Sequence, residues 1–195
     1  MSMSLDGYIA GPDDRPGQEL GRGGGRLFNW LDERHGPGID GQVYAEALDT
    51  GAVISGRRTF ELAGRWNGDH HDGVPIHVLT HHVEDGDVPP GTARFHTDVA
   101  TCVAEARAGA GGRAILVHGA GAAQALLAAG LLDELEIHLV PVLLGGGRRL
   151  FGEDDPRVEL VPVRQLQGSE ATHLRYRVAR PAPTTSARPG KPAPA

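Results

Sequence analysis

The chain has 195 residues, of which 39% are hydrophobic and 23% charged, a balance typical of one globular domain. Its formal net charge of −6 comes without a basic stripe, which argues against sequence-independent binding to nucleic acid or anionic membranes. No stretch approaches the roughly 20 apolar residues of a membrane helix, and the N-terminal residues show no export signal. We therefore predict a soluble, cytoplasmic protein.

The first expected strands and helices alternate along the chain. This order is typical of a sheet covered by crossover helices, and it predicts an α/β fold with a strand-rich C-terminal part. The expected strands are Met3–Ile9, Ala52–Ser55, Pro75–Thr80, Ala93–His96, Ala114–His118, Leu135–Leu144, Val158–Val163 and Leu174–Val178. The expected helices are Val43–Leu48, Thr59–Leu62, Val99–Ala108 and Ala122–Ala129.

Several single residues have structural roles that the pattern predicts. Cys102 is the only cysteine, which excludes an internal disulfide, and we expect it to be buried. Apolar and polar residues alternate around His138, so that His138 lies on the face opposite the buried one. The triplet Gly145–Gly147 favours a tight reversal with positive φ. Residues 181–195 are rich in Pro and Ala without apolar periodicity, so we predict a domain over residues 1–180 and a disordered tail.

The first segment with chemical potential is Gly56, Arg57, Arg58 and Thr59, which follows a strand and opens a helix. Free backbone N–H groups at such a helix start favour an anion, and two arginines with a hydroxyl suit phosphate. The alternative is an ordinary solvated helix start.

The second segment is His118, Gly119, Ala120 and Gly121, where a strand runs into small residues and then into an apolar helix. Small residues let a phosphate or sugar approach the backbone closely. The spacing does not satisfy G-x-G-x-x-G, and close packing of helix on strand is the competing interpretation.

The third segment is Leu79, Thr80 and His81, a strand end at the edge of the sheet where open α/β sheets bind ligands. Thr80 and His81 could contact a ribose phosphate. A polar loop without a binding role would look the same.

Taken in order, these segments resemble the dihydrofolate reductase-like superfamily, and especially the bacterial group similar to the RibD C-terminal reductase domain. The resemblance covers about Met3 to Val178. Its most specific blocks are SLDGYIAGP from Ser4, GRRTFE from Gly56, and GLLDEL from Gly130 together with PVLLGGG from Pro141.

The resemblance implies a largely parallel sheet flanked by helices, NADPH across its C-terminal edge, a small heterocyclic substrate and a homodimer. It implies that Gly56, Arg57, Arg58 and Thr59 bind cofactor phosphates, and that Leu79, Thr80 and His81 meet the adenosine ribose and its 2′-phosphate. By the same resemblance, the His118–Gly121 segment binds the pyrophosphate and Ala10 lies against the nicotinamide. The family usually has a Gly-Gly pair where this chain has His118-Gly119 or Gly119-Ala120.

By position, Asp40 corresponds to the carboxylate that assists substrate protonation in dihydrofolate reductase. A buried carboxyl there could keep a raised pKa and relay a proton. Alternatively, Asp40 caps the helix that starts near Gly41. Glu46 is a weaker substitute on the same helix, and Asp6 beside Gly7 fits a turn.

The competing functional hypothesis is a dinucleotide-binding or ligand-sensing protein without turnover, because a fold alone does not establish chemistry. A third hypothesis takes His70-His71-Asp72 and His81-His82 as metal ligands. Adjacent residues on a strand point to opposite faces, and neither group has the i, i+4 spacing of a common zinc site. We therefore predict no metal.

Overall fold

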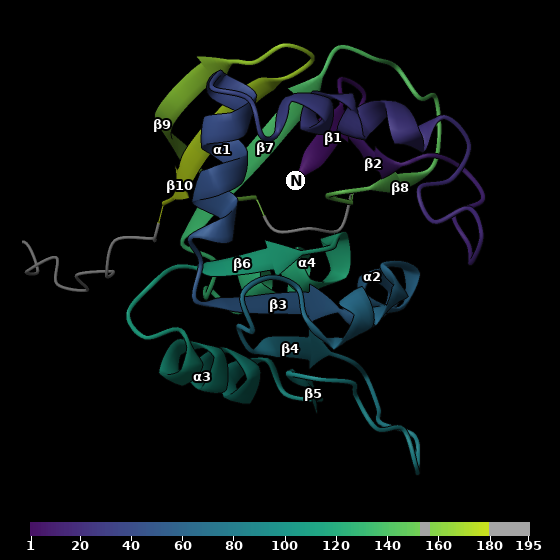
Figure 1. The fold of residues 1–195 in the computed structure, drawn as a ribbon, viewed down its shortest axis with the longest axis vertical. Helices are drawn as coiled ribbons and strands as arrows, with labels where there is room; N and C mark the ends of the chain where they lie inside the picture. The colour runs from purple at the N-terminus through teal and green to yellow at the C-terminus, as the bar shows by residue number, and fades with distance from the viewer. Residues whose placement is uncertain (153–156, 180–195) are drawn as a thin grey trace, which may run out of the picture.

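The computed structural model describes residues 1–152 and 157–179, and the predicted tail at 181–195 lies outside them. The two larger sheets lie one above the other along the long axis of the molecule (Figure 1). No helix in the described part is long and apolar enough to cross a membrane.

The lower sheet in Figure 1 is entirely parallel and has the strand order β5-β4-β3-β6. Its strands are β3 (Ala52–Gly56), β4 (Ile76–Leu79), β5 (Ala93–His96) and β6 (Ile115–His118). The register pairs Gly56 with Leu79 and Ser55 with His118, so three strands end at one edge.

Helices cover both faces of this parallel sheet. On one face α3 (Val99–Gly109) and α4 (Ala120–Ala128) pack on Ala52 and Ile54, with Cys102 fully buried between them as predicted. On the other face, Phe60 of α2 (Arg57–Leu62) and Trp66 of the 3-10 helix η2 (Gly64–Gly68) pack on Val53. The predicted mostly parallel sheet flanked by helices is confirmed.

The second sheet is mixed, with the order β1-β7-β10-β9. Its strands are β1 (Ser2–Ser4), β7 (Glu134–Val140), β9 (Leu160–Gln167) and β10 (Thr172–Val178). A separate ribbon joins β2 (Tyr8–Ala10) to β8 (Arg148–Arg149). In the described part of the chain, no strand pairing links β6 to β1, and α4 packs against both sheets instead.

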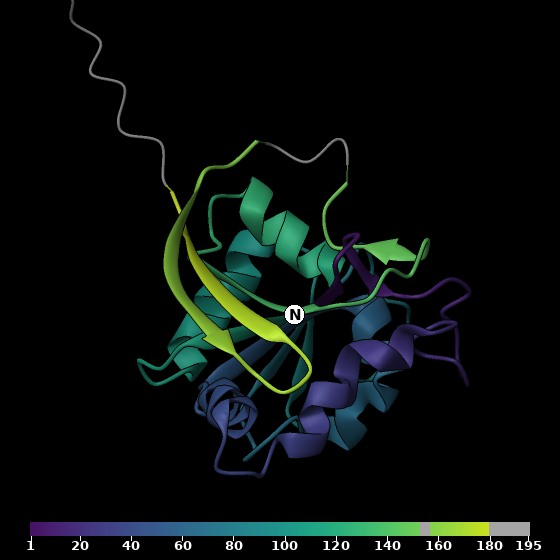
Figure 2. The same cartoon turned by 90° about the horizontal axis from the view of Figure 1, so that it is seen from above.

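Both faces of β7 are covered. Leu135 and Ile137 pack toward α4, whereas His138 faces the 3-10 helix η1 (Gly24–Glu33) and α1 (Ile39–Leu48). Seen from above in Figure 2, η1 and α1 lie on the side of the mixed sheet that α4 does not cover. The face of β7 on which alternation places His138 is therefore also buried.

Three predicted strands differ most from the observed ones. Met3–Ile9 is interrupted because Gly7 adopts φ of 89° and its amide bonds to Ser4, which forms the turn expected around Asp6. The strand predicted to reach Leu144 ends at Val140, because Pro141 has no amide hydrogen for the ladder. The strand predicted at Val158–Val163 is β9 at Leu160–Gln167, and its Pro162 is tolerated because β9 is an edge strand.

Candidate functional site

The first two predicted segments meet at the edge where β3 and β6 end. Thr59, in the first turn of α2, lies directly against Gly119, which has φ of 88°. A Cβ added to Gly119 would stand 2.2 Å from the Thr59 hydroxyl oxygen. The turn between β6 and α4 therefore requires glycine at this position, both for its backbone conformation and for its contact.

Space remains open next to this contact. A Cβ added to Gly121 would meet no heavy atom within 4 Å, and Gly56 packs on the Ala122 amide. Ala120 is buried and starts α4. The backbone from Gly119 to Gly121 thus offers a small-residue surface at a helix start, where an anion can approach.

The His118 side chain turns away from this edge. Its Nε2 lies 2.9 Å from Nε2 of His70, and its ring lies against Trp66. Burial lowers the pKa of His118 to about 3. Only the backbone of His118 therefore belongs to the candidate site.

The two arginines diverge from the start of α2. Arg57 bonds to Glu61 and Asp87, and its guanidinium lies over the Phe95 ring at 4.3 Å from the centroid. Arg58 pairs with Asp14 at 3.0 Å, and the same carboxylate also lies 3.4 Å from Arg148. Both cations stand beside the predicted phosphate position, but each already has an acidic partner.

The third segment continues the same edge toward β5. The Thr80 amide donates to the carbonyl of His96 at 2.9 Å, and the Thr80 hydroxyl donates to the carbonyl of His82. Leu79 and Thr80 are half-buried and His81 is exposed. Together with the β3 and β6 ends, they form one continuous row along the edge of the parallel sheet.

Ala10 is buried in β2, beneath the reversal at Gly145–Gly147. A Cβ on Gly147, which has φ of 121°, would lie 2.1 Å from the Ala10 carbonyl oxygen. Gly145 also has positive φ, so the predicted reversal is confirmed. The neighbouring Ile9 packs with Ala120 and Ala123, which places β2 beside the glycine turn.

Asp40 lies in the first turn of α1 and is buried against the mixed sheet. Its carboxylate accepts a hydrogen bond from the Ser169 amide at 2.8 Å and lies 2.8 Å from Nε2 of His173. A Cβ on Gly168 would stand 2.1 Å from the same carboxylate. None of these partners belongs to the three segments at the sheet edge.

Both interpretations of Asp40 need correction. The helix is capped at Gly38 without a side-chain bond, so Asp40 is not the cap. Burial raises the pKa of Asp40, but the hydrogen bonds from Ser169 and His173 outweigh burial, and the net pKa lies below its usual value. A raised pKa at this carboxyl was therefore the wrong expectation.

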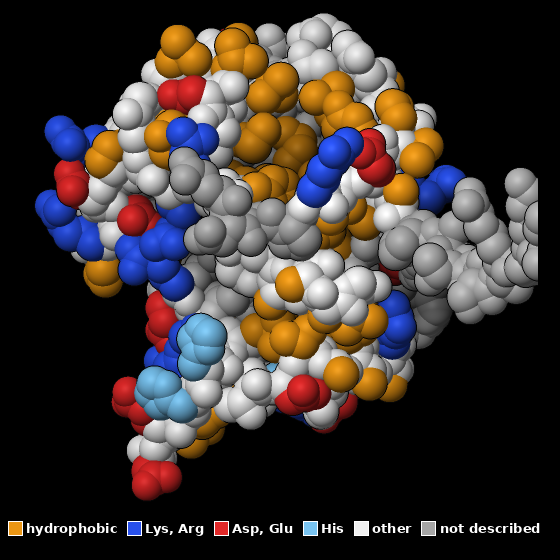
Figure 3. Space-filling view, turned by 180° about the vertical axis from the view of Figure 1, so that it is seen from behind, with side chains coloured by type: hydrophobic (Ala, Val, Ile, Leu, Met, Phe, Trp, Pro, Cys, Tyr) orange, Lys and Arg blue, Asp and Glu red, His pale blue; other side chains and the backbone are white. Residues whose placement is uncertain are grey.

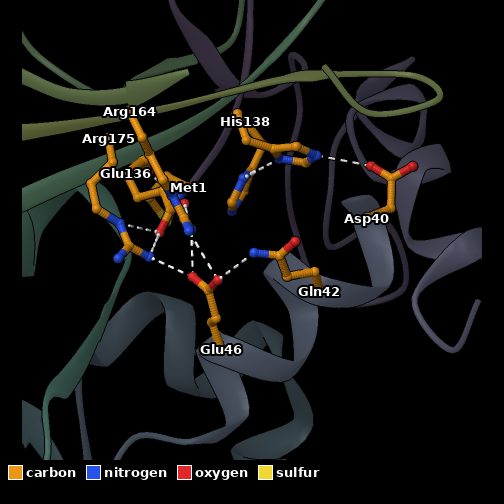
Figure 4. Close-up of polar contacts among 9 residues, drawn as sticks. Met1, Asp40, Gln42, Glu46, Glu136, His138, Arg164 and Arg175 are labelled. Carbon is orange, nitrogen blue, oxygen red and sulfur yellow. Dashed lines mark hydrogen bonds and ion pairs between the residues drawn. The ribbon is translucent and has the colours of Figure 1, made fainter. Parts of the chain in front are cut away.

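Asp40, His173 and His138 form a series of contacts that we call the Asp40 chain (Figure 4). His173 Nε2 faces the carboxylate, and His173 Nδ1 lies 2.8 Å from Nδ1 of His138. Because an ionised carboxylate only accepts, His173 donates from Nε2 to Asp40. Asp40 thus orients His173, and the rings of His173 and His138 both pack against Trp30.

Glu46, nearly two turns further along α1, belongs to an ion-pair network with residues of the mixed sheet (Figure 4). It binds Arg164 at 2.5 Å and Arg175 at 3.1 Å, and both arginines also bind Glu136. The hydrogen bond from Arg164 outweighs burial and lowers the pKa of Glu46 to about 2. This carboxylate is therefore held as an anion.

Sequence reasoning missed His173, Arg164 and Arg175. The pairing of β10 with β7 places His173 opposite His138 and Arg175 opposite Glu136. Alternation along β10 could have placed His173 and Arg175 on one face. The pairing register that brings them to Asp40 and Glu46 was not readable from local pattern.

A parallel sheet that ends beside a helix start and a glycine turn, followed by a mixed strand-rich half, defines an α/β protein of the dihydrofolate reductase-like type. Among the solved structures that share this fold, three examples are all of low identity. A Shewanella sp. PV-4 protein described as a riboflavin biosynthesis protein is 23% identical, with TM-score 0.64 over 91% of this chain and 96% of that one.

The other two structures widen the comparison. RibD of Acinetobacter baumannii is 15% identical, with TM-score 0.58 over 91% of this chain but 57% of its own. Dihydrofolate reductase of Enterococcus faecalis, solved with NADP(H), is 16% identical, with TM-score 0.53 over 91% and 93% of the two chains. A search of the curated proteins found no match.

The family model described as the RibD C-terminal domain matches residues 1–174. The chain belongs to this family. Membership supports a reductase-type function.

Proposed function

We propose that the protein is an NADPH-dependent reductase that transfers a hydride to a small heterocyclic substrate. The observation that carries this proposal is the junction of Thr59 with Gly119 at the edge of the parallel sheet. It joins a helix start bearing two arginines to a small-residue turn with open space at Gly121. Backbone amides and guanidinium groups are the donors that a pyrophosphate needs.

The residues present fit the dinucleotide. Gly56, Arg58 and Thr59 would hold the pyrophosphate together with the Gly119–Gly121 backbone, and Arg57, Thr80 and His81 would hold the ribose 2′-phosphate. The E. faecalis dihydrofolate reductase, whose fold this chain shares, was solved with NADP(H). When bound, NADPH would supply the hydride. Ala10, in β2 beside the glycine turn, would lie near the nicotinamide.

On binding, the cofactor phosphates would replace acidic residues as the partners of the two arginines. Arg58 releases Asp14, and Arg57 releases Asp87 while keeping Glu61 on its own helix. Arg58 is about half exposed, so that its ion pair with Asp14 contributes little and the exchange costs little.

Asp40 acts as a positioning residue in this proposal. The ionised carboxylate holds the ring of His173, and His173 in turn contacts His138, so that Asp40 positions both rings. His138, at the end of this series of hydrogen bonds, lies between Asp40 and the Glu46 network (Figure 4).

The test is a fluorescence titration with NADPH and, in parallel, NADH. We expect NADPH to bind more tightly than NADH. The affinity for NADPH should fall by about tenfold or more in Arg57→Ala and in Thr80→Ala. It should fall similarly in Gly121→Ala, where a methyl group enters the open space. The control is Arg113→Ala, an exposed arginine outside the three segments. Failure of the folded protein to bind either dinucleotide would refute the reductase proposal.

The competing function, a dinucleotide-binding protein without turnover, predicts the same titration. It is favoured if NADPH binds as described, yet no pterin, pyrimidine, flavin-precursor or quinone-type acceptor gives oxidation of NADPH. Turnover that Asp40→Asn reduces more in kcat than in KM would support the reductase.

We further propose a homodimer that uses β9. This edge strand exposes Leu160, Val161 and Val163, and an exposed apolar edge is a site for pairing with another chain. Light scattering should show a dimer that Val161→Glu shifts toward monomer, whereas Val88→Glu, at another exposed apolar residue, leaves the dimer intact. A monomeric wild type at micromolar concentration would refute the dimer.

A further inference from the structure

A second histidine cluster lies apart from the Asp40 chain, on the α3 face of the parallel sheet. His77 of β4 and His96 of β5 are both buried there, with Nδ1 of His77 2.9 Å from Nε2 of His96. Glu105 of α3 stands over the pair. One ligand atom from each of the three residues lies within 4.8 Å of the other two.

The remaining nitrogen of His77 sets this cluster apart from the other histidine groups. In the Asp40 chain, Nε2 of His173 has the Asp40 carboxylate as its partner. In the group that contains His70, Nε2 of His71 has the Thr50 carbonyl as its partner. In contrast, Nε2 of His77 is buried and has no hydrogen-bond partner among the residues that the structure describes. A buried polar atom without a partner is destabilising and calls for a water or an ion.

The two rings are placed to share one ion. Both are buried and lie in contact, so a metal bound by one ring is within reach of the other. A neutral imidazole always carries one lone pair, and a metal selects the tautomer that presents it.

The ligand set and the access route agree with each other. Two imidazoles and one carboxylate are a common protein set for Zn²⁺, with water as a fourth ligand. Glu105 is exposed, so the fourth position opens to solvent at the edge of the sheet, beside β5. Arg94 is a charged neighbour, 3.8 Å from the Glu105 carboxylate.

We propose that His77, His96 and Glu105 form a binding site for a divalent transition-metal ion, with Zn²⁺ as the best match. This site differs from the groups His70-His71-Asp72 and His81-His82 that the sequence first suggested. It departs from the expectation that the chain binds no metal. Because His96 accepts the Thr80 amide through its carbonyl, the metal would also stiffen the strand end at the proposed adenosine site.

The test uses tag-free, full-length protein that has been treated with a chelator. Isothermal titration with Zn²⁺ should give one site per chain, and Co²⁺ should give the visible absorption of a low-coordinate ion. Glu105→Gln, on the surface, and His96→Asn should each weaken Zn²⁺ binding by about tenfold or more. Loss of a residue that only supports a metal ligand already lowers metal affinity by about tenfold, and these two residues are ligands themselves. Circular dichroism checks that both variants are folded.

Two matched controls separate this site from weak surface binding. Arg94→Gln removes the cation beside Glu105 but no ligand, so it should keep or strengthen Zn²⁺ binding. His82→Asn removes a highly exposed histidine and should change nothing. If Glu105→Gln and His96→Asn bind Zn²⁺ as tightly as the wild type, or if the wild type takes no ion, the proposal is wrong. These outcomes are independent of NADPH binding.

Discussion

At the scale of single residues, glycine positions carry the most specific information about the candidate site. Gly119 and Gly121 lie two residues apart, and their surroundings differ. Gly119 has φ of 88° and touches Thr59, whereas Gly121 lies in α4 with open space around it. The two positions therefore separate the role of the turn in folding from its role in binding.

We predict that Gly119→Ala lowers the free energy of unfolding by about 1–3 kcal/mol, because the new methyl group meets Thr59 and the backbone is strained. Gly121→Ala should keep or raise stability by up to about 1 kcal/mol, because alanine favours the helix. Urea unfolding of both variants measures the difference. Equal stability of the two variants would contradict the geometry of the turn.

Asp40 is the residue whose role the structure changes most. We predict that Asp40→Asn lowers the free energy of unfolding by about 1.5–3 kcal/mol, because the charged hydrogen bonds to Ser169 and His173 are buried. The control is Asp49→Asn at the exposed end of the same helix, which should change stability by less than about 0.5 kcal/mol. Similar urea midpoints for the two variants would argue against the Asp40 chain.

At the scale of elements, α1 is held to the mixed sheet by polar contacts as well as by apolar ones. Val43 packs with Val140 and Trp30, while Asp40 and Glu46 reach His173 and the two arginines. Such partly buried charges are destabilising when they lose a partner. The helix should therefore be sensitive to acid.

We predict that Glu46→Gln lowers stability at pH 7 and flattens its acid dependence. The folded pKa of Glu46, about 2, lies below its ordinary value of 4.5. Its stabilisation is therefore complete above about pH 4.5 and is lost as the pH falls through 2. Thermal melts between pH 7 and 2.5 should show the wild-type advantage shrinking. An advantage that stays constant to pH 2.5 would disagree with the ion-pair network.

At the scale of the whole molecule, neutral histidines recur in the interior. Burial lowers the pKa of His70 and His77 to about 4 and that of His118 to about 3. The pKa of His138 is also lowered by burial. The unfolded chain binds protons on these residues below about pH 6.5, and the folded chain does not.

We predict that the stabilisation from these histidines is complete above about pH 6.5 and falls steadily as the pH drops toward about 5, above the ordinary pKa values of the carboxylates. Calorimetric melting temperatures at pH 7.5, 6.0 and 5.0 measure this slope. His70→Gln should reduce it, whereas His35→Gln, at an exposed residue, should leave it unchanged. A melting temperature that is constant from pH 7.5 to 5.0 would contradict this expectation.

Local pattern predicted much of the parallel sheet. Ala93–His96 was placed with its observed bounds, and β3, β4 and β6 were within a residue or so, because short apolar runs between turns are strong local signals. The predicted strand boundaries were wrong where one residue interrupts an apolar run, as at Gly7 and Pro141. The division into two sheets was not predicted, because strand pairing is a long-range property.

The sequence by itself determined the fold class and the family, and it named the segments at the sheet edge. These follow from local periodicity and from short blocks of residues in order. Only the tertiary structure decided what the polar side chains do. It turned His118 away from the edge, gave the arginines acidic partners and joined Asp40 to His173 across 133 positions of the chain. Hydrogen bonds and pKa values depend on three-dimensional neighbours, and local sequence does not specify those neighbours.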